Sequence, residues 1–198
     1  MINNISRRNL FLSVFLPFYM VSCVTKPDIS HFSPVYLTDK SRFFLLPAAD
    51  IEKPLDCAQQ ISLYYNGQEI TMNAWVRADE NGIEMTLFNT MGINMGEFSF
   101  KNSAIILDSP VFPGSFKAEY LAADFQLCYF RPDALKKALL KIGLLFEVIK
   151  NDDSNGAPVE IRRISESGKT ILEIEKKRNE IRYTNFLRGY GYTLKEAD

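Results

Sequence analysis

Histidine is scarce in this sequence, and its scarcity argues against several kinds of active site. His31 is the only histidine among 198 residues. Nucleophilic sites of the Ser/His/Asp or Cys/His kind need an imidazole within hydrogen-bond reach of the nucleophile. His31 lies in a segment rich in Pro and Ser, where a lone histidine is usually exposed and inert. We therefore expect no catalysis of this kind.

Motifs for metal ions and phosphate groups are also missing. The cysteines at 23, 57 and 128 form neither a CxxC motif nor the Cys/His spacing of a zinc site. The glycines of Arg188-Gly189-Tyr190-Gly191 precede no predicted helix, which a phosphate-binding loop requires. Neighbouring carboxylates are typical of solvated surface, at Asp152-Asp153 in a polar loop and at Glu173 and Glu175 on a charged strand face. We expect no metal, no cofactor and no enzymatic activity.

An excess of positive charge is absent as well. The chain has 23 Lys and Arg against 24 Asp and Glu, a formal net charge of −1 at pH 7. Proteins that bind nucleic acid usually carry a basic patch or excess, so we expect no nucleic-acid partner. Hydrophobic residues make up 46% of the chain, with fifteen Phe and nine Tyr, which is typical of a globular domain that buries or uses many aromatic rings.

No hydrophobic run is long enough for a spanning helix, but a shorter one lies near the start. Residues 10–23 hold about ten apolar residues behind Arg7 and Arg8, which is the form of a secretory signal peptide. The run ends on Met20-Val21-Ser22-Cys23, which resembles the bacterial lipobox. We predict a signal peptide at 1–22 and a lipid attached to Cys23; the alternative is an uncleaved anchor with a chance cysteine.

The predicted lipid determines where the protein would work. A lipidated Cys23 would hold the protein at a membrane, and Val24, in a position where Asp signals retention at the inner membrane, favours the periplasmic face of the bacterial outer membrane. Residues 23–42 contain several Pro and Ser and are predicted to form a lipidated tether, with one domain at 43–198. Cys57 and Cys128 are either unpaired, partly buried thiols or a disulfide, since the sequence alone cannot bring them together.

Alternating apolar residues predict an antiparallel meander of about five strands. Hairpin turns are indicated at Asn66-Gly67 and Asn81-Gly82. Between them, every second residue from Ile70 to Ala78 is apolar. The alternation slips between Ile93 and Phe100, which predicts a β-bulge across Gly96-Glu97. Such a meander has one apolar face that needs a cover.

The middle of the chain supplies that cover as a helical insert. Helices are predicted over 117–130 and from Pro132 to Gly143, because Pro suits a first turn and Gly a C-terminal cap. Strands then return at 144–149, 159–164, 170–176, 181–184 and 191–195. Strands, helices and strands again describe a single α+β domain.

Two segments resemble a known family. The stretch Leu121-Ala122-Ala123-Asp124-Phe125-Gln126-Leu127-Cys128-Tyr129-Phe130 and the ending from Asn185 to Leu194 look like the signatures of bacterial lipoproteins grouped as domain of unknown function 3261. That family is similar in architecture to LolB, the outer-membrane lipoprotein receptor. The resemblance implies a LolA/LolB-like fold for 43–198, a curved, unclosed antiparallel β-barrel whose apolar concave face is covered by helices.

The resemblance also implies a role for the apolar face of the meander. Its side chains become candidates for lining a hydrophobic groove, although ordinary core packing explains them equally well: Ile70, Met72, Val76, Ile83, Met85, Leu87, Met95 and Phe98. Methionine suits such a groove because its side chain is flexible and polarizable. Three further apolar residues, Val111, Phe112 and Phe116, lie in a loop between prolines and a glycine and either contact membrane or cargo or pack into the barrel mouth.

Two functions follow as expectations. The first is an outer-membrane lipoprotein that binds acyl chains of a lipid or lipoprotein, receives this cargo from a periplasmic LolA-like carrier and assists its delivery, without covalent catalysis. The second is a structural or interaction lipoprotein of the cell envelope with no lipid ligand. An enzyme that processes acyl groups through Cys128 or a carboxylate is a distant third.

Overall fold

The computed structural model describes residues 32, 34–101, 104–110, 112 and 115–197. The predicted signal peptide, the predicted lipidation site at Cys23, the first part of the predicted tether and His31 lie outside the described residues. Val111, in the predicted cargo loop, lies outside them too. Within the described part of the chain, no helix is long and apolar enough to cross a membrane.

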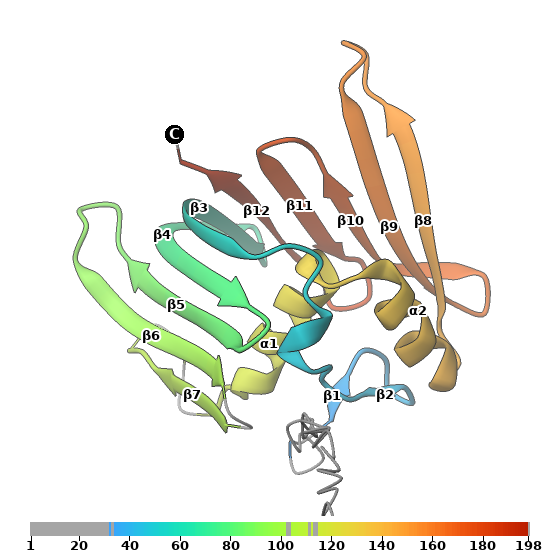
Figure 1. Ribbon diagram of the computed structural model, residues 1–198, viewed down its shortest axis with the longest axis horizontal. Coiled ribbons are helices and arrows are strands. Elements are labelled where there is room, and N and C mark those ends of the chain that lie inside the picture. The colour runs from blue at the N-terminus through green and yellow to red at the C-terminus, as the bar shows by residue number, and fades with distance from the viewer. Residues whose placement is uncertain (1–31, 33, 102–103, 111, 113–114, 198) are drawn as a thin grey trace, which may run out of the picture.

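Ten strands form one open antiparallel sheet. The strands are β3 (Leu55–Tyr65), β4 (Gln68–Asp79), β5 (Gly82–Phe88), β6 (Asn94–Lys101), β7 (Ala104–Asp108), β8 (Leu145–Asp152), β9 (Pro158–Glu166), β10 (Lys169–Lys176), β11 (Glu180–Asn185) and β12 (Tyr190–Glu196). Their order is β7-β6-β5-β4-β3-β12-β11-β10-β9-β8. Two five-stranded meanders are therefore joined by the pairing of β3 with β12, and β7 and β8 form the two edges. The sheet curves but does not close (Figure 1), which confirms an open, curved α+β fold.

The strands follow the predicted alternation. On β4, Met72, Ala74, Val76 and Ala78 are buried, while most residues between them keep some exposure. Asn66 and Gly67 have φ values of 50° and 73°. Positive φ at both central residues is what a type I′ hairpin turn requires, and Gly adopts it without steric cost. This part of the sheet is therefore specified by local sequence.

The predicted bulge is present, displaced by one residue. Leu87 faces Gly96 across the β5–β6 ladder, whereas Phe88 faces Asn94, so Met95 is the extra residue. Gly96 has a φ of 129°, and a Cβ atom built on it would lie 2.3 Å from the carbonyl oxygen of Asp108. The next strand, β7, thus approaches the backbone closely at this bulge, which only glycine permits.

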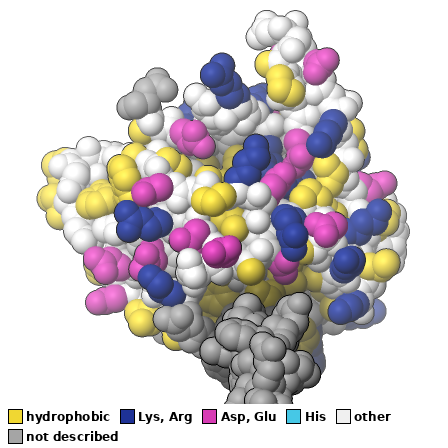
Figure 2. Space-filling model, viewed as in Figure 1, with side chains coloured by type: hydrophobic (Ala, Val, Ile, Leu, Met, Phe, Trp, Pro, Cys, Tyr) yellow, Lys and Arg dark blue, Asp and Glu magenta, His cyan; other side chains and the backbone are white. Residues whose placement is uncertain are grey.

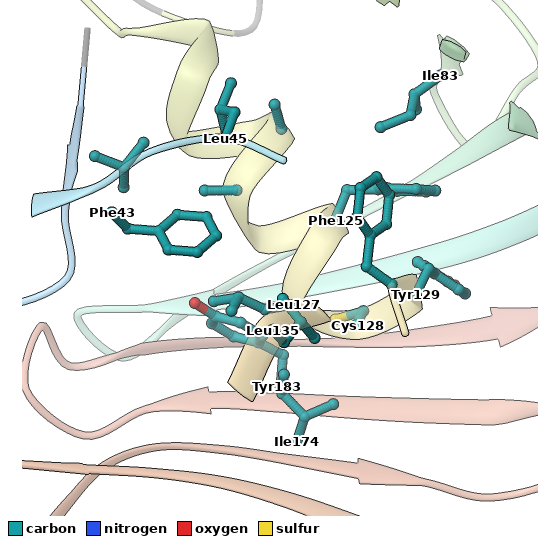
Figure 3. Close-up of a cluster of buried hydrophobic side chains, with 14 of the residues drawn as sticks. Phe43, Leu45, Ile83, Phe125, Leu127, Cys128, Tyr129, Leu135, Ile174 and Tyr183 are labelled. Carbon is teal, nitrogen blue, oxygen red and sulfur yellow. The ribbon is translucent and has the colours of Figure 1, made fainter. Parts of the chain in front are cut away.

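Two helices connect the two meanders and lie on the concave side of the sheet (Figure 1). They are α1 (Ala118–Tyr129) and α2 (Pro132–Lys141). Pro132 occupies the first turn of α2, as predicted, and Gly143 follows its end with a φ of 79°. Buried side chains surround α1 (Figure 3). Phe43 and Leu45 lie on one side of the helix, and Leu135 and Ile174 lie on another. The helix is thus the centre of the core.

The packed part of the chain begins earlier than the predicted boundary at residue 43. Strands β1 (Val35–Tyr36) and β2 (Arg42–Phe43) pair with each other, and Val35 and Leu37 are buried in the core. The Ser41 hydroxyl donates to the carbonyl oxygen of Ile142 at 3.1 Å. Because this stretch contains Pro and Ser, the sequence predicted a tether, although Val35 and Leu37 alternate as in a strand with one buried face. A tether over 23–42 is therefore too long at its C-terminal end.

Candidate ligand-binding cavity

An apolar cavity of about 410 Å³ lies between α1 and the concave face of the sheet. Strands β3, β4, β5 and β12 form one wall, and α1 with the segment that precedes it forms the other. The helical residues that line it include Leu121, Phe125, Cys128 and Tyr129, which recur at the spacing of one helix face. The volume falls in the range of roughly 300–1,000 Å³ typical of small-molecule sites.

Five of the eight predicted groove residues line this cavity: Ile70, Met72, Val76, Met85 and Leu87. The other three do not. Ile83 and Phe98 are buried in the core, and Met95 packs against it. The short 3₁₀ helix η1 (Ala48–Asp50) packs against β4 and β5. The chain therefore covers part of the apolar face that the sequence alone left open.

The cavity opens beside three turns of the sheet. Antiparallel pairing places the β3–β4, β5–β6 and β11–β12 turns at one end of the sheet. Tyr65 and Ile70 line the cavity at this end and are exposed to solvent. Phe112 and Phe116 also line it, and their rings stack with centroids 4.7 Å apart. These four residues form the mouth.

A hydrogen-bonded pair forms the floor at the opposite end. The Gln59 Nε2 atom donates to the Tyr129 hydroxyl at 2.8 Å, and both side chains are buried. Beyond this pair lies a second, polar pocket whose wall includes Glu52, Glu160 and Lys176. The pair therefore separates apolar space from charged surface. On the molecular face shown in Figure 2, basic and acidic side chains are intermixed.

One wall carries a carboxyl group that the sequence analysis did not single out. The Tyr183 hydroxyl donates to Asp124 Oδ1 at 2.6 Å, and the Tyr190 hydroxyl donates to Oδ2 at 2.9 Å. The two hydroxyl oxygens are 3.3 Å apart. Burial raises the pKa of Asp124 to about 6, although the two tyrosine hydrogen bonds oppose that shift. The spacing of Asp124 with Leu121 and Cys128 on one helix face was the signal that could have placed it in the cavity.

The two described cysteines are free thiols, so the disulfide alternative is wrong in this structure. Cys57 is half-buried, and Cys128 is fully buried against the cavity. The Cys128 sulfur lies 3.6 Å from the Tyr192 hydroxyl. Burial raises the pKa of Cys128 to about 12. Since the thiolate is the reactive form, Cys128 is a poor nucleophile at neutral pH.

A buried arginine fixes α1 over the cavity. Arg162, on β9, donates from Nη1 to the carbonyl oxygens of Leu127 at 3.2 Å and Phe130 at 2.8 Å. Its Nε and Nη2 atoms donate to Glu160 at 2.8 Å and Glu52 at 2.7 Å. A cation at a helix C-terminus satisfies unpaired carbonyls and complements the helix dipole. The sequence contains no signal for this role, because Val159 and Ile161 lie on the strand face opposite to Arg162.

Comparison of the sequence with known protein families identifies a family of unknown function. Residues 56–198 match a family described as Protein of unknown function (DUF3261). No curated protein matches the chain. Among the described residues, no group of three or more His, Cys, Asp or Glu side chains is placed to hold a metal ion.

Proposed function

This chain belongs to the DUF3261 family of proteins of unknown function, and we propose that it binds the acyl chain of a lipid or lipoprotein. The observation that carries this proposal is the apolar cavity between α1 and the sheet. Protein interiors are normally close-packed, so a space of about 410 Å³ inside a curved sheet is room for a ligand rather than ordinary core.

The energetics suit reversible transfer of an apolar chain. Burying each methylene group contributes about 0.8 kcal/mol, which a carrier with a similar groove would match. A chain that leaves such a carrier for this cavity loses little apolar burial. Small differences between the two grooves then set the direction of transfer.

The proposed cellular role extends this binding to the outer membrane. Cys23 would be the lipid-bearing N-terminus that holds the domain at the periplasmic face, and a LolA-like carrier would bring the cargo. The lipobox-like Met20–Cys23 segment supports the anchor. The open, curved sheet with helices on its concave face supports a LolB-like receptor.

Binding in this proposal involves no covalent step. Cys128 is the thiol that lines the cavity, and burial raises the pKa of this thiol to about 12. The Asp124 carboxyl is held by Tyr183 and Tyr190. Neither group is arranged with a histidine base among the described residues.

A substitution that fills the cavity tests the proposal. Met85→Trp replaces a flexible side chain that lines the cavity with a bulky indole ring. We expect native mass spectrometry to show less co-purifying lipid for this variant than for the wild type, and a fluorescent fatty acid to bind it at least tenfold more weakly. Met91→Trp is the matched control, because Met91 is exposed and does not line the cavity. Its binding should equal that of the wild type.

Equal binding by both variants, or no lipid bound by the wild type, would contradict the proposal. The second result would favour the alternative, a structural or interaction lipoprotein of the envelope. Crosslinked protein partners that persist in cells with Met85→Trp would then support that role.

A further inference from the structure

Asp124 is an acidic residue in a cavity wall that is otherwise largely apolar and aromatic. Its neighbours on the same helix face are apolar, and the wall opposite is formed largely by aliphatic and Met side chains. Within the described part of the chain, no Lys or Arg forms an ion pair with it. A carboxylate in such surroundings is costly unless hydrogen bonds compensate it.

Two tyrosines supply that compensation in a fixed arrangement. Tyr183 is fully buried, and its ring stacks on Tyr192 with centroids 4.5 Å apart and planes at 7°. Tyr190 donates to the second carboxylate oxygen at 2.9 Å. The hydroxyl groups are therefore held in place before any ligand enters.

The tyrosines leave part of the acceptor capacity of Asp124 unused. An ionised carboxylate has about four lone-pair sites, and two tyrosine protons occupy two of them. Asp124 is not fully buried, and it lines the cavity. The part of its side chain that the protein leaves uncovered is therefore accessible to a ligand in the cavity. With a pKa of about 6, it is ionised at pH 7.5 and can only accept hydrogen bonds.

This geometry sets a requirement for the ligand. Resting on the proposed function, we propose that the cavity prefers an apolar chain that carries a hydrogen-bond donor, such as a hydroxyl group, and that Asp124 accepts that hydrogen bond. A chain with a carboxylate would be repelled at this position, and its head group would remain at the mouth beside Tyr65. Asp124 is thus a specificity-determining residue of the cavity, set on the face of α1 that covers it.

The test compares an alcohol with its methyl ether, in which a methyl group replaces the hydroxyl proton and removes the hydrogen-bond donor. At pH 7.5, 1-dodecanol and dodecyl methyl ether compete with a fluorescent fatty acid for the full-length protein. We expect the alcohol to bind about tenfold more tightly than the ether, because hydrogen bonds to charged groups are among the stronger ones. Dodecanoate should show no gain over the ether.

Two variants separate recognition from support of the fold. Asp124→Asn keeps the shape of the side chain but removes its charge, and the preference for the alcohol should fall to about threefold or less. Tyr190→Phe removes a competing donor and leaves the carboxylate, so the preference should be kept or increased. A purely structural Asp124 would change the stability of both variants and leave the alcohol-to-ether ratio unchanged.

The outcomes distinguish this inference from the function on which it rests. Equal affinities of alcohol and ether for the wild type, with both displacing the probe, would overturn the inference and leave acyl-chain binding intact. An unchanged ratio in Asp124→Asn would also overturn it. If no ligand binds the wild type at all, both proposals fail.

Discussion

Two charged side chains, the buried Arg162 and the partly buried Asp124, connect α1 to the second meander. Asp124 receives hydrogen bonds from Tyr183 on β11 and Tyr190 on β12. Arg162, on β9, holds the carbonyl groups at the end of the helix. The helix that covers the cavity is thus positioned by polar contacts at Asp124 and at its C-terminal end, while the rest of its cavity face is largely apolar.

Asp124 should make stability depend on pH. Its pKa rises from 3.8 to about 6 on folding because of burial. Between those values the folded state binds more protons than the unfolded state, so this stabilising contribution is present below about pH 4 and is lost as the pH rises through 6. We expect the stability of the wild type relative to Asp124→Asn to fall by about 2 kcal/mol between pH 4 and pH 7.5.

Urea unfolding of both proteins at each pH measures this difference. Asn cannot titrate, so the variant corrects for every other group in the protein. A difference that stays constant, or that grows with pH, would show that the carboxyl group is not held in a raised-pKa environment.

Arg162 should be far more important to stability than its neighbour Arg163. Arg162→Met leaves two buried carbonyl groups without their side-chain donor and removes the closest cation from Glu160 and Glu52, so we expect a loss of about 3–5 kcal/mol in the free energy of unfolding. Arg163 is partly exposed and forms an ion pair with Glu173 at 2.8 Å. Arg163→Met should therefore cost less than about 1 kcal/mol. Similar losses from both substitutions in urea titrations would contradict the role given to Arg162.

At the level of elements, the sequence predicted what is locally encoded. The alternation on β4 and the Asn66-Gly67 turn depend on residues close in the chain, and both are present. The pairing of β3 with β12 joins segments more than a hundred residues apart, so no local sequence pattern predicts it. Long-range packing also decides which residues of the predicted apolar face line the cavity. Ile83 lies on that face, but it is buried in the core, and the 3₁₀ helix η1 packs against its strand β5. The sequence near Ile83 does not show this packing.

The bulge at Met95 and Gly96 should be a sensitive point of the first meander. Gly96→Ala would place a Cβ atom 2.3 Å from the Asp108 carbonyl oxygen, at a φ of 129°, so β6 and β7 would have to separate. We expect a loss of about 3 kcal/mol or more in the free energy of unfolding.

Gly92 provides the control for backbone conformation alone. It has a φ of 80° with nothing within 4 Å of a built Cβ, so Gly92→Ala should cost only about 1 kcal/mol. If thermal or urea unfolding shows equal losses for the two variants, the close approach of β7 is not what requires glycine at 96.

The whole molecule is a curved sheet built from two meanders around one helix. The connection from β7 to β8 carries α1 across the concave side, so the cover of the cavity and the link between the meanders are the same segment (Figure 1). The cavity receives walls from the first meander, from β12 of the second and from the helix. A ligand in it would contact both halves of the chain.

The methionines of the chain offer the most direct test of acyl-chain binding. Met72 and Met85 line the cavity, whereas Met91 is exposed and Met95 lies outside the lining. In protein labelled with ¹³C at the methionine methyl groups, titration with a long-chain fatty acid should shift the NMR signals of Met72 and Met85 and leave that of Met91 unchanged. Shifts confined to Met91, or no shifts at saturating fatty acid, would contradict the account.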